Sequence, residues 1–389
     1  MLLRARLPLR TTWSTSCIHT SLPRSAELKA SIKLVAEIRK ITDNQVSFAK
    51  AKEALLATQN DFDAALAWLE EDSIVSGAKK AAKVASRIAN DGLVGIAVLS
   101  DGSSGVRGAG ATGVRAAMVE VNCETDFVAR NELFTRLVAD IAHTAAYLGE
   151  EPSSSPSSLT KSGFILPFPV DMLSAAPLIS TPSSSSPVSL DPSRTVSSVI
   201  QEATAKIGEK ISLRRACTFI GPALPPNSTL ALRVGNYIHQ SSSTQPQAGK
   251  IGTLVALALK SNRLPQFMAA GGDNEVRTMG RALARQIVGL NAQSVEASSA
   301  SRGAAGDASS TVLYAQPFMM RPGGSSEASV RTSLNEWAHE KGLVSVAGSS
   351  QAEEDGLEVL EFVKWNVGEG IEKSESEGGF AEEVRRLSG

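Results

Sequence analysis

From residue 29 onward, apolar residues recur every three or four positions. These apolar positions are Ile32, Val35, Ile38, Phe48, Ala51, Leu55, Phe62, Leu66 and Leu69. The spacing places apolar side chains on one face of each of three short helices. Asn60 or Asp61 is suited to begin the third helix, because a short polar side chain can accept a hydrogen bond from the first helical turn. We therefore predict a three-helix module over residues 29–72, of a size that usually serves for docking.

The next segment changes from a helical period to strict alternation. Apolar residues alternate in "LVGIAVL" and again in "VRAAMVEVN", with a glycine-rich stretch between them. This pattern predicts a β-hairpin with a long loop. Asn131 is the expected N-cap of a following helix, whose apolar face comprises Phe134, Leu137, Val138, Ile141 and Ala145. Residues 73–149 are therefore predicted to form an α+β subdomain, core subdomain N.

The same order of elements returns later in the chain. "TVSSVIQEATAKI" predicts a helix and "ISLRRACTFIG" a strand. "LALRVGNYIHQ" and "KIGTLVALAL" predict a second hairpin, which the helix "RTMGRALARQIVGL" follows. The recurrence indicates a weak internal duplication of architecture. We predict core subdomain C over residues 196–389, ending in the helix "GGFAEEVRRL", and expect a cleft between the two subdomains.

Serine and proline dominate the stretch between these subdomains. Residues 150–195 include "EPSSSPSSLT" and "STPSSSSPVSLDPS". Such a composition buries too little apolar surface to offset the entropy of ordering the chain. We predict a linker or insert here, in which the apolar piece "GFILPFPVDML" packs locally.

Composition narrows the range of functions. At 389 residues the chain is long enough for two or three domains. The formal net charge is −1, the pI is near 6.5, and no long lysine or arginine block is present, which argues against direct nucleic-acid binding. Cys17, Cys123 and Cys217 lie too far apart for a disulfide framework or a structural zinc site. Since no run of about 20 apolar residues occurs, we expect no membrane-spanning helix.

The first 26 residues differ from the rest. "MLLRARLPLRTTWSTSCIHTSLPRSA" contains four arginines, many serines and threonines, and no acid. This composition is typical of a mitochondrial transit peptide, with a disordered basic tail as the alternative. A secretory signal is disfavoured because the apolar run is short and broken by arginines. We predict that residues 1–26 direct the chain to the mitochondrial matrix and that their removal leaves a net charge near −5.

Several motifs suggest chemistry, and each has a simpler structural explanation. "GAGATG" matches a dinucleotide fingerprint, but a strand follows it instead of the helix that would receive a pyrophosphate, so a loop is favoured. Cys123 and His143 flank a junction with nothing to couple them as nucleophile and base. His239 ends a strand without a spaced partner for a metal ion. "VGEGIEK" suggests a tight turn with positive φ. We therefore expect no metal, no cofactor and no enzymatic activity.

The stretch "NCETDFVARN", residues 122–131, sets an acid beside a large apolar ring where the alternating run meets the helix. Phe127 can be a core residue that packs near the helix start, with Asp126 as an acid favoured by the helix dipole. Alternatively, the pair is an exposed apolar anchor with an acidic neighbour, which inserts into a pocket of a partner. Residue chemistry alone favours the structural interpretation, and the pattern does not separate the two.

"VEVNCETDFVARNELF" resembles the signature of the elongation factor Ts family, the guanine-nucleotide exchange factors for elongation factor Tu. Further stretches match the family in the same order: "AAKVASRIANDGLVGI", "AKIGEKISLRR", "VGNYIHQ" with "GKIGTLVAL", "QPFMM", and "VGEGIEK" with "FAEEV". The resemblance covers roughly residues 30–389, and its specificity comes from this shared order.

The resemblance implies an α+β fold. It consists of an N-terminal three-helix module similar to ubiquitin-associated domains, followed by two related α+β core subdomains with small antiparallel sheets. The implied function is that of a translation elongation factor that binds mitochondrial elongation factor Tu with GDP and promotes GDP release, so that GTP can bind. It implies no cofactor and no direct contact with nucleic acid or membrane. The alternative is an adaptor that binds a ubiquitin-like modifier through the N-terminal module.

The resemblance also implies contact residues. In the family, the Asp-Phe pair contacts the GTPase domain of the partner. Asp126 and Phe127 would insert near the phosphate loop and the switch region and displace the elements that hold Mg²⁺ and GDP. The other implied contact residues are Thr125, Val128, Ile207, Gly208, His239 and Lys52. Lys50 competes with Lys52 for the N-terminal contact, because this chain is longer than the family pattern between Thr42 and Leu55.

Two departures from the family pattern stand out. Bacterial members often carry a long helical hairpin where this chain has the short interval "SVEASSASRGAAGDASST". Dimerisation through such a hairpin is therefore not implied here. The serine- and proline-rich insert and the acidic loop "GSSQAEEDG" are additions to the pattern, and we expect both to be mobile.

Overall fold

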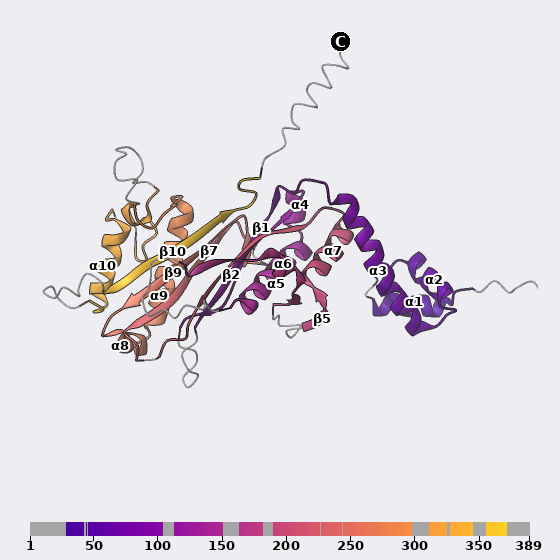
Figure 1. The fold of residues 1–389 in the computed structure, drawn as a ribbon, viewed down its shortest axis with the longest axis horizontal. Helices are drawn as coiled ribbons and strands as arrows, with labels where there is room; N and C mark the ends of the chain where they lie inside the picture. The colour runs from indigo at the N-terminus through magenta and orange to yellow at the C-terminus, as the bar shows by residue number, and fades with distance from the viewer. Residues whose placement is uncertain are drawn as a thin grey trace, which may run out of the picture. The chain divides into compact units, whose positions relative to one another are not determined.

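The computed structural model describes residues 29–42, 44, 46–103, 113–150, 163–181, 190–225, 227–242, 244–297, 311–324, 327–344 and 355–371. The chain divides into two compact units, Met1–Ser73 and Ile74–Gly389 (Figure 1). The predicted transit peptide, most of the glycine-rich loop and of the acidic loop, and the predicted last helix lie outside the described residues.

The first unit contains three helices. These are α1 (Ile32–Ile41), α2 (Phe48–Ala57) and the start of α3 (Phe62–Val84). Their common core comprises Val35, Ile38, Ala51, Ala54, Leu55, Ala65 and Leu69. Asp61 caps α3 by accepting the Ala64 N–H at 2.9 Å, so of the two predicted caps the structure selects Asp61. The predicted helices are present, and their likeness to a ubiquitin-associated domain stays a prediction.

α3 is longer than the sequence predicted. It continues past the expected end of the module at residue 72 and ends at Val84. The segment after Asp72 is rich in alanine and lysine and contains no proline, so nothing in it stops the helix. None of the described helices is long and apolar enough to cross a membrane.

The second unit begins with a five-stranded antiparallel sheet. Its strands are β1 (Asp91–Asp101), β2 (Val114–Cys123), β3 (Ile165–Phe168), β6 (Ser212–Gly221) and β8 (Ala248–Gly249), in the order β3-β6-β2-β1-β8. α5 (Glu132–Leu148) covers one face, where its Phe134 and Val138 share a core with Val119. The helix lies so close that a Cβ at Gly95 would come within 2.7 Å of a Val138 methyl group.

A three-stranded antiparallel sheet forms the other half of this unit. β7 (Leu230–His239) and β9 (Ile251–Lys260) form the second predicted hairpin, and β10 (Gly356–Asn366) extends it in the order β10-β9-β7. The outer face is covered by α8 (Leu264–Ala269), α9 (Gly272–Gly289), α10 (Val330–Glu340) and the 3₁₀ helix η3 (Leu313–Ala315). A hairpin followed by a covering helix therefore occurs twice. This recurrence confirms the α+β class and the predicted duplication.

The two sheets pack face to face. A third core lies between them and includes Ile96 and Met118 of the first sheet with Val234, Leu254 and Ala256 of the second. The layers are therefore helix, sheet, sheet and helix (Figure 1). The expected cleft between the subdomains is wrong, because apolar side chains fill the space. Both faces of the central strands are buried, which fits their almost continuous apolar sequence.

Part of the predicted linker is structured. Its described residues contain β3, α6 (Val170–Ala175), β4 (Pro177–Ile179) and β5 (Leu190–Thr195), and α7 (Val196–Ile207) follows. β3 pairs with β6 through Ile165 and Phe219, so the apolar piece packs locally as predicted. β6 was assigned to core subdomain C but pairs with β2 of the first sheet. The prediction grouped β6 with the strands that follow it in the chain. This grouping was wrong, because strands that are far apart in the chain can pair in one sheet.

Candidate partner-binding site

Phe127 points away from the core of the protein. The junction after β2 forms the short helix α4 (Asp126–Ala129), and Thr125 caps it by accepting the Val128 N–H at 3.4 Å. Val128 and Ala129 are 7% and 2% exposed, whereas Phe127 is 79% exposed. Successive helical side chains point about 100° apart, so burial of the two following residues turns Phe127 outward. The interpretation of Phe127 as a core residue is therefore wrong.

Asp126 stands beside this ring on the surface. Its carboxylate accepts a hydrogen bond from Arg130, one helical turn later, at 2.6 Å. The side chains of both residues remain substantially exposed. Surface pairs of this kind contribute only about 0.3–0.5 kcal/mol, so Asp126 can exchange its partner at low cost.

The loop after α7 holds this junction in place. Gly208 ends α7 in the left-handed conformation, with φ of +85°. The Glu209 carboxylate accepts the Thr125 backbone N–H at 3.0 Å and the Thr125 hydroxyl at 2.8 Å. In return, the Glu124 carboxylate accepts the Lys210 backbone N–H at 2.6 Å. Each loop thus supplies an acid that binds the backbone of the other.

We name residues 125–127 together with Ile207 and Gly208 the tip. Ile207 is half-buried and packs against the core of the first sheet, while Gly208 is exposed and has open space around its Cα. The structure therefore places the two predicted contact segments side by side, with Val128 buried beneath them. The hydrogen bonds between the loops fix Phe127 relative to Gly208.

His239 lies at the end of β7 in the other sheet and is exposed. Its carbonyl accepts the Lys250 backbone N–H at 3.0 Å, and the Lys250 ammonium contacts the Asp91 carboxylate. Asp91 is paired with Cys123, the last residue of β2 before the junction. His239 is thus joined to the tip through a short series of contacts at neighbouring strand ends.

Lys52 and Lys50 differ in what they contact within the first unit. Lys50 forms ion pairs with Asp72 at 2.9 Å and Glu53 at 3.2 Å, and lies 5.2 Å from the centre of the Trp68 ring. The hydrogen bond to Asp72 raises the pKa of Lys50 above its ordinary value. Lys52 is exposed and, within the described residues, forms no ion pair. Which of the two lysines meets a partner stays a prediction.

A buried acid that the sequence analysis missed anchors a second turn near these strand ends. Glu120, fully buried on β2, accepts hydrogen bonds from Arg214 at 2.9 Å, Arg215 at 2.6 Å and the Gly368 N–H at 2.8 Å. Burial raises the pKa of Glu120, but these donors outweigh it and hold the pKa below its ordinary value. Gly368 has φ of +73°, which confirms the predicted tight turn in "VGEGIEK". The sequence feature that could have indicated this buried acid is a charged residue inside the largely apolar strand "VRAAMVEVN".

The described residues contain no catalytic arrangement at the candidate nucleophile. Burial raises the pKa of the Cys123 thiol to about 12, which makes it a poor nucleophile. The Cys123 thiol donates to the Thr125 carbonyl at 3.2 Å, and His143 contacts the Ile179 carbonyl at 3.2 Å. Among the described residues no three His, Cys, Asp or Glu side chains are grouped as metal ligands would be.

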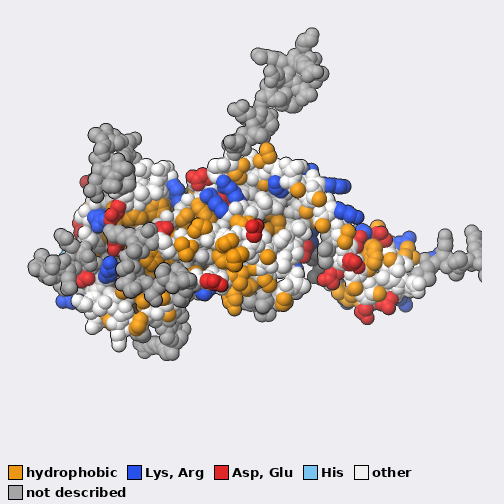
Figure 2. Space-filling view, in the orientation of Figure 1, with side chains coloured by type: hydrophobic (Ala, Val, Ile, Leu, Met, Phe, Trp, Pro, Cys, Tyr) orange, Lys and Arg blue, Asp and Glu red, His pale blue; other side chains and the backbone are white. Residues whose placement is uncertain are grey.

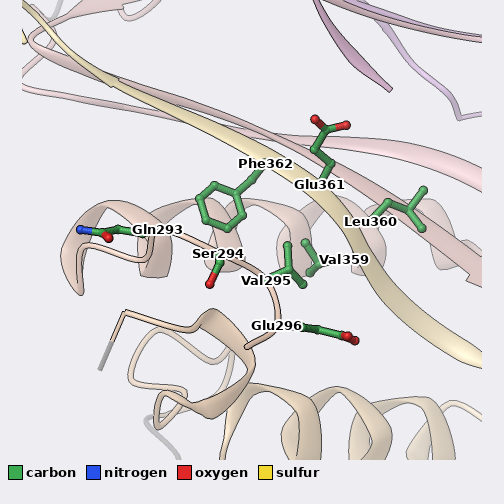
Figure 3. A pocket seen from close by; sticks show the side chains of 8 residues that line it. All are labelled: Gln293, Ser294, Val295, Glu296, Val359, Leu360, Glu361 and Phe362. Atoms are coloured by element: carbon green, nitrogen blue, oxygen red, sulfur yellow. The ribbon is translucent and has the colours of Figure 1, made fainter. Parts of the chain in front are cut away.

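A hollow of about 320 Å³ lies between β10 and residues 293–296. Figure 3 shows Phe362 and Val359 pointing toward that loop, while Glu361 points to the other side of the strand. The Glu361 carboxylate accepts the N–H groups of residues 163–165 at 3.0–3.2 Å, and Glu296 is paired with Arg331. Since both acids of the hollow are engaged elsewhere, few polar groups converge there to orient a small molecule.

Comparison with known proteins places this architecture in a family. A family profile described as "Elongation factor TS" matches residues 124–369, which include both loops of the tip and the turn at Gly368. Mitochondrial elongation factor Ts of Coprinopsis cinerea is 43% identical, with 94% of this chain and 98% of that protein covered. The Laccaria bicolor protein of the same name is 43% identical, with 88% and 92% covered. That of Mycosarcoma maydis is 37% identical, with 97% and 94% covered.

The profile and these relatives define a translation elongation factor. The chain belongs to the elongation factor Ts family. Its relatives are named as mitochondrial proteins, which confirms the predicted mitochondrial location.

Proposed function

We propose that this chain is the guanine-nucleotide exchange factor of mitochondrial elongation factor Tu and acts in the mitochondrial matrix. The supporting observation is Phe127, which is 79% exposed at a junction that the hydrogen bonds from Thr125 to the Glu209 carboxylate hold in place. A rigid aromatic ring beside a charged residue is the kind of anchor that dominates protein–protein binding. Because the ring is already held outward, little ordering entropy is lost on binding.

The exchange mechanism requires no covalent step. A factor that binds the nucleotide-free GTPase more tightly than the GDP-bound form must weaken GDP binding by the same factor. Burying the Phe127 ring in a pocket that opens only when GDP leaves supplies roughly 1.5–3 kcal/mol. This free energy corresponds to about one to two decades in affinity. Further contacts are therefore needed for fast exchange.

Asp126 supplies a different kind of contact. Next to the inserted ring, its carboxylate brings a negative charge toward the site where the GTPase holds Mg²⁺ and the phosphates of GDP. Like charges at short range repel more strongly in a protein site than in water. The proposed result is displacement of the elements that hold the metal and the diphosphate.

The remaining contacts spread over the molecule. Ile207 and Gly208 present backbone beside the inserted ring, and His239 reaches the partner from the end of the second sheet. Lys52 provides a contact from the three-helix module at residues 29–72, which we propose is a separate docking unit. Several modest contacts of this kind add to the contribution of Phe127.

The direct test is release of fluorescent GDP from purified mitochondrial elongation factor Tu, with and without this chain. We expect release to accelerate in proportion to the concentration of the chain until it saturates. Unchanged release would contradict the proposal. Retention of a ubiquitin-like modifier, without retention of elongation factor Tu, in a parallel pull-down would favour the adaptor alternative.

A further inference from the structure

The second half of α3 carries a basic surface that the overall charge of the chain conceals. Between Asp72 and Asp91 the chain contains four cations and no acid. These exposed cations are Lys79, Lys80, Lys83 and Arg87. At about 100° per residue, the three lysines fall within an arc of about 100° on the helix. Gly77 and Val84 lie about 20° apart on the helix and are buried, whereas the three lysines are exposed.

This surface adjoins the tip. A Cβ at Gly77 would lie 3.6 Å from the Ala205 methyl group, so α3 runs against the last turn of α7. Farther along, the Lys210 ammonium donates to the Arg87 carbonyl at 2.8 Å. The Arg87 guanidinium lies 3.4 Å from the Glu124 carboxylate, next to the tip. Figure 2 shows Lys and Arg side chains over this part of α3.

The nearby acids leave a surplus of positive charge. Glu124 is paired with Arg87, Asp126 with Arg130, and Glu209 binds Thr125. The lysines at 79, 80 and 83, which we name the basic face, form no ion pair within the described part of the chain. A cluster of like charges without compensation is repulsive in the free protein and becomes favourable against an acidic surface.

We propose that the basic face binds an acidic protein surface on the GTPase, beside the pocket that receives Phe127. The inference rests on the proposed exchange function and extends it from the tip to α3. Complementary charge next to the insertion point raises the rate of encounter and orients the partner before the ring enters.

A protein surface fits better than a nucleic acid. The formal net charge of the whole chain is −1 and no long lysine or arginine block is present, so an extended phosphate backbone would find few cations beyond the basic face. Single-stranded nucleic acids also stack their bases on aromatic side chains, and residues 78–87 contain none.

The test is the association rate of the full chain with GDP-bound mitochondrial elongation factor Tu, measured by stopped flow over a range of salt concentrations. The variant carries Lys80→Ala and Lys83→Ala, which preserve helix propensity. The matched control carries Arg263→Ala and Lys341→Ala, which remove the same charge near the far end of β9. We expect the first variant to associate about three- to tenfold more slowly at low salt, with a flatter salt dependence, and the control to match the unmodified chain.

Two outcomes overturn the inference while the exchange function stands. One is an unchanged association rate and salt dependence in the Lys80/Lys83 variant, although the chain still accelerates GDP release. The other is binding of labelled transfer RNA at about 0.1 M salt that these lysines control, with association to the GTPase unaltered. Failure of the unmodified chain to accelerate GDP release would instead remove the proposed function itself.

Discussion

The Glu209 carboxylate accepts two hydrogen bonds from Thr125, one from the backbone N–H at 3.0 Å and one from the hydroxyl at 2.8 Å. The two residues lie 84 positions apart in the chain, yet together they fix the direction in which Phe127 leaves the surface. The direction of the Phe127 ring therefore depends on Glu209, which acts on it through Thr125.

Replacing Glu209 is expected to impair exchange through Phe127. Glu209→Ala removes both hydrogen bonds to Thr125, so the ring samples more directions and loses affinity for its pocket. We expect stimulated GDP release to fall by about threefold or more, while the free energy of unfolding falls by only about 1–2 kcal/mol. For Glu209→Gln, the rate of stimulated GDP release should lie between that of Glu209→Ala and that of the unmodified chain.

A double-mutant cycle distinguishes positioning from a merely structural role. In a chain that already carries Phe127→Ala, Glu209→Ala should have little further effect on GDP release. Equal losses in both backgrounds would show that Glu209 does not act through Phe127.

Asp126 is expected to matter for exchange and little for stability. Within the part of the chain that the structure describes, its carboxylate pairs with the exposed Arg130, and such pairs contribute about 0.3–0.5 kcal/mol. Asp126→Ala should therefore slow stimulated GDP release without a measurable loss of thermal stability. Arg130→Ala is the matched control, because it breaks the same pair and leaves the acid in place. If both variants release GDP at the unmodified rate, Asp126 is not part of the site.

The two neighbouring lysines of α2 should separate binding from folding. Lys52→Ala is expected to weaken affinity for elongation factor Tu by about two- to tenfold with an unchanged melting temperature. Lys50→Ala should lower the melting temperature of the three-helix module, because it loses its pairs with Asp72 and Glu53. Titration with elongation factor Tu measures the affinity, and thermal unfolding measures the melting temperature. Weaker affinity for Lys50→Ala and unchanged affinity for Lys52→Ala would identify Lys50 as the contact.

Glu120 should contribute stability that depends on pH. Its pKa in the folded protein lies below its ordinary value of 4.5, because Gly368, Arg214 and Arg215 donate to the charged form. That stability is fully present above about pH 5 and is lost as the pH falls from 4.5 through the lower folded pKa. Glu120→Gln should cost about 1–3 kcal/mol at neutral pH. In the Glu120→Gln variant, the free energy of unfolding should also fall less steeply at acidic pH than in the unmodified chain. Denaturant unfolding at several pH values measures this difference. An equal pH dependence in both chains would contradict this role.

The sequence predicted those elements that depend on local periodicity. The helical stripe ending at Leu69 and the alternation around Val119 both mark faces that are buried in the structure. The expected cleft failed because "TLVALAL" in β9 is apolar on both faces, which signals burial on both sides rather than exposure of one. Strand β6 was assigned to the wrong sheet because pairing partners are not adjacent in the chain.

The geometry of the candidate site was predicted in part, and its role stays a proposal. The resemblance located Asp126, Phe127 and Gly208, but residue chemistry alone favoured a buried ring. Burial of Val128 and Ala129 decides that question. The direction in which the Phe127 side chain points follows only from the helical backbone of α4, which the sequence did not predict. The contacts of Glu209 with Thr125 have no signature in the sequence, because they join two loops that are distant along the chain.

The central claim is that an exposed, fixed Phe127 drives nucleotide release. Its most direct test is the rate of stimulated GDP release from mitochondrial elongation factor Tu by Phe127→Ala. The control is Met172→Ala, which removes another exposed apolar side chain, 62% exposed on α6, near the start of α7 and away from Gly208. We predict about a tenfold or greater loss for Phe127→Ala, an unchanged melting temperature, and an unmodified rate for the control. Stimulated release by folded Phe127→Ala at the unmodified rate would contradict the account.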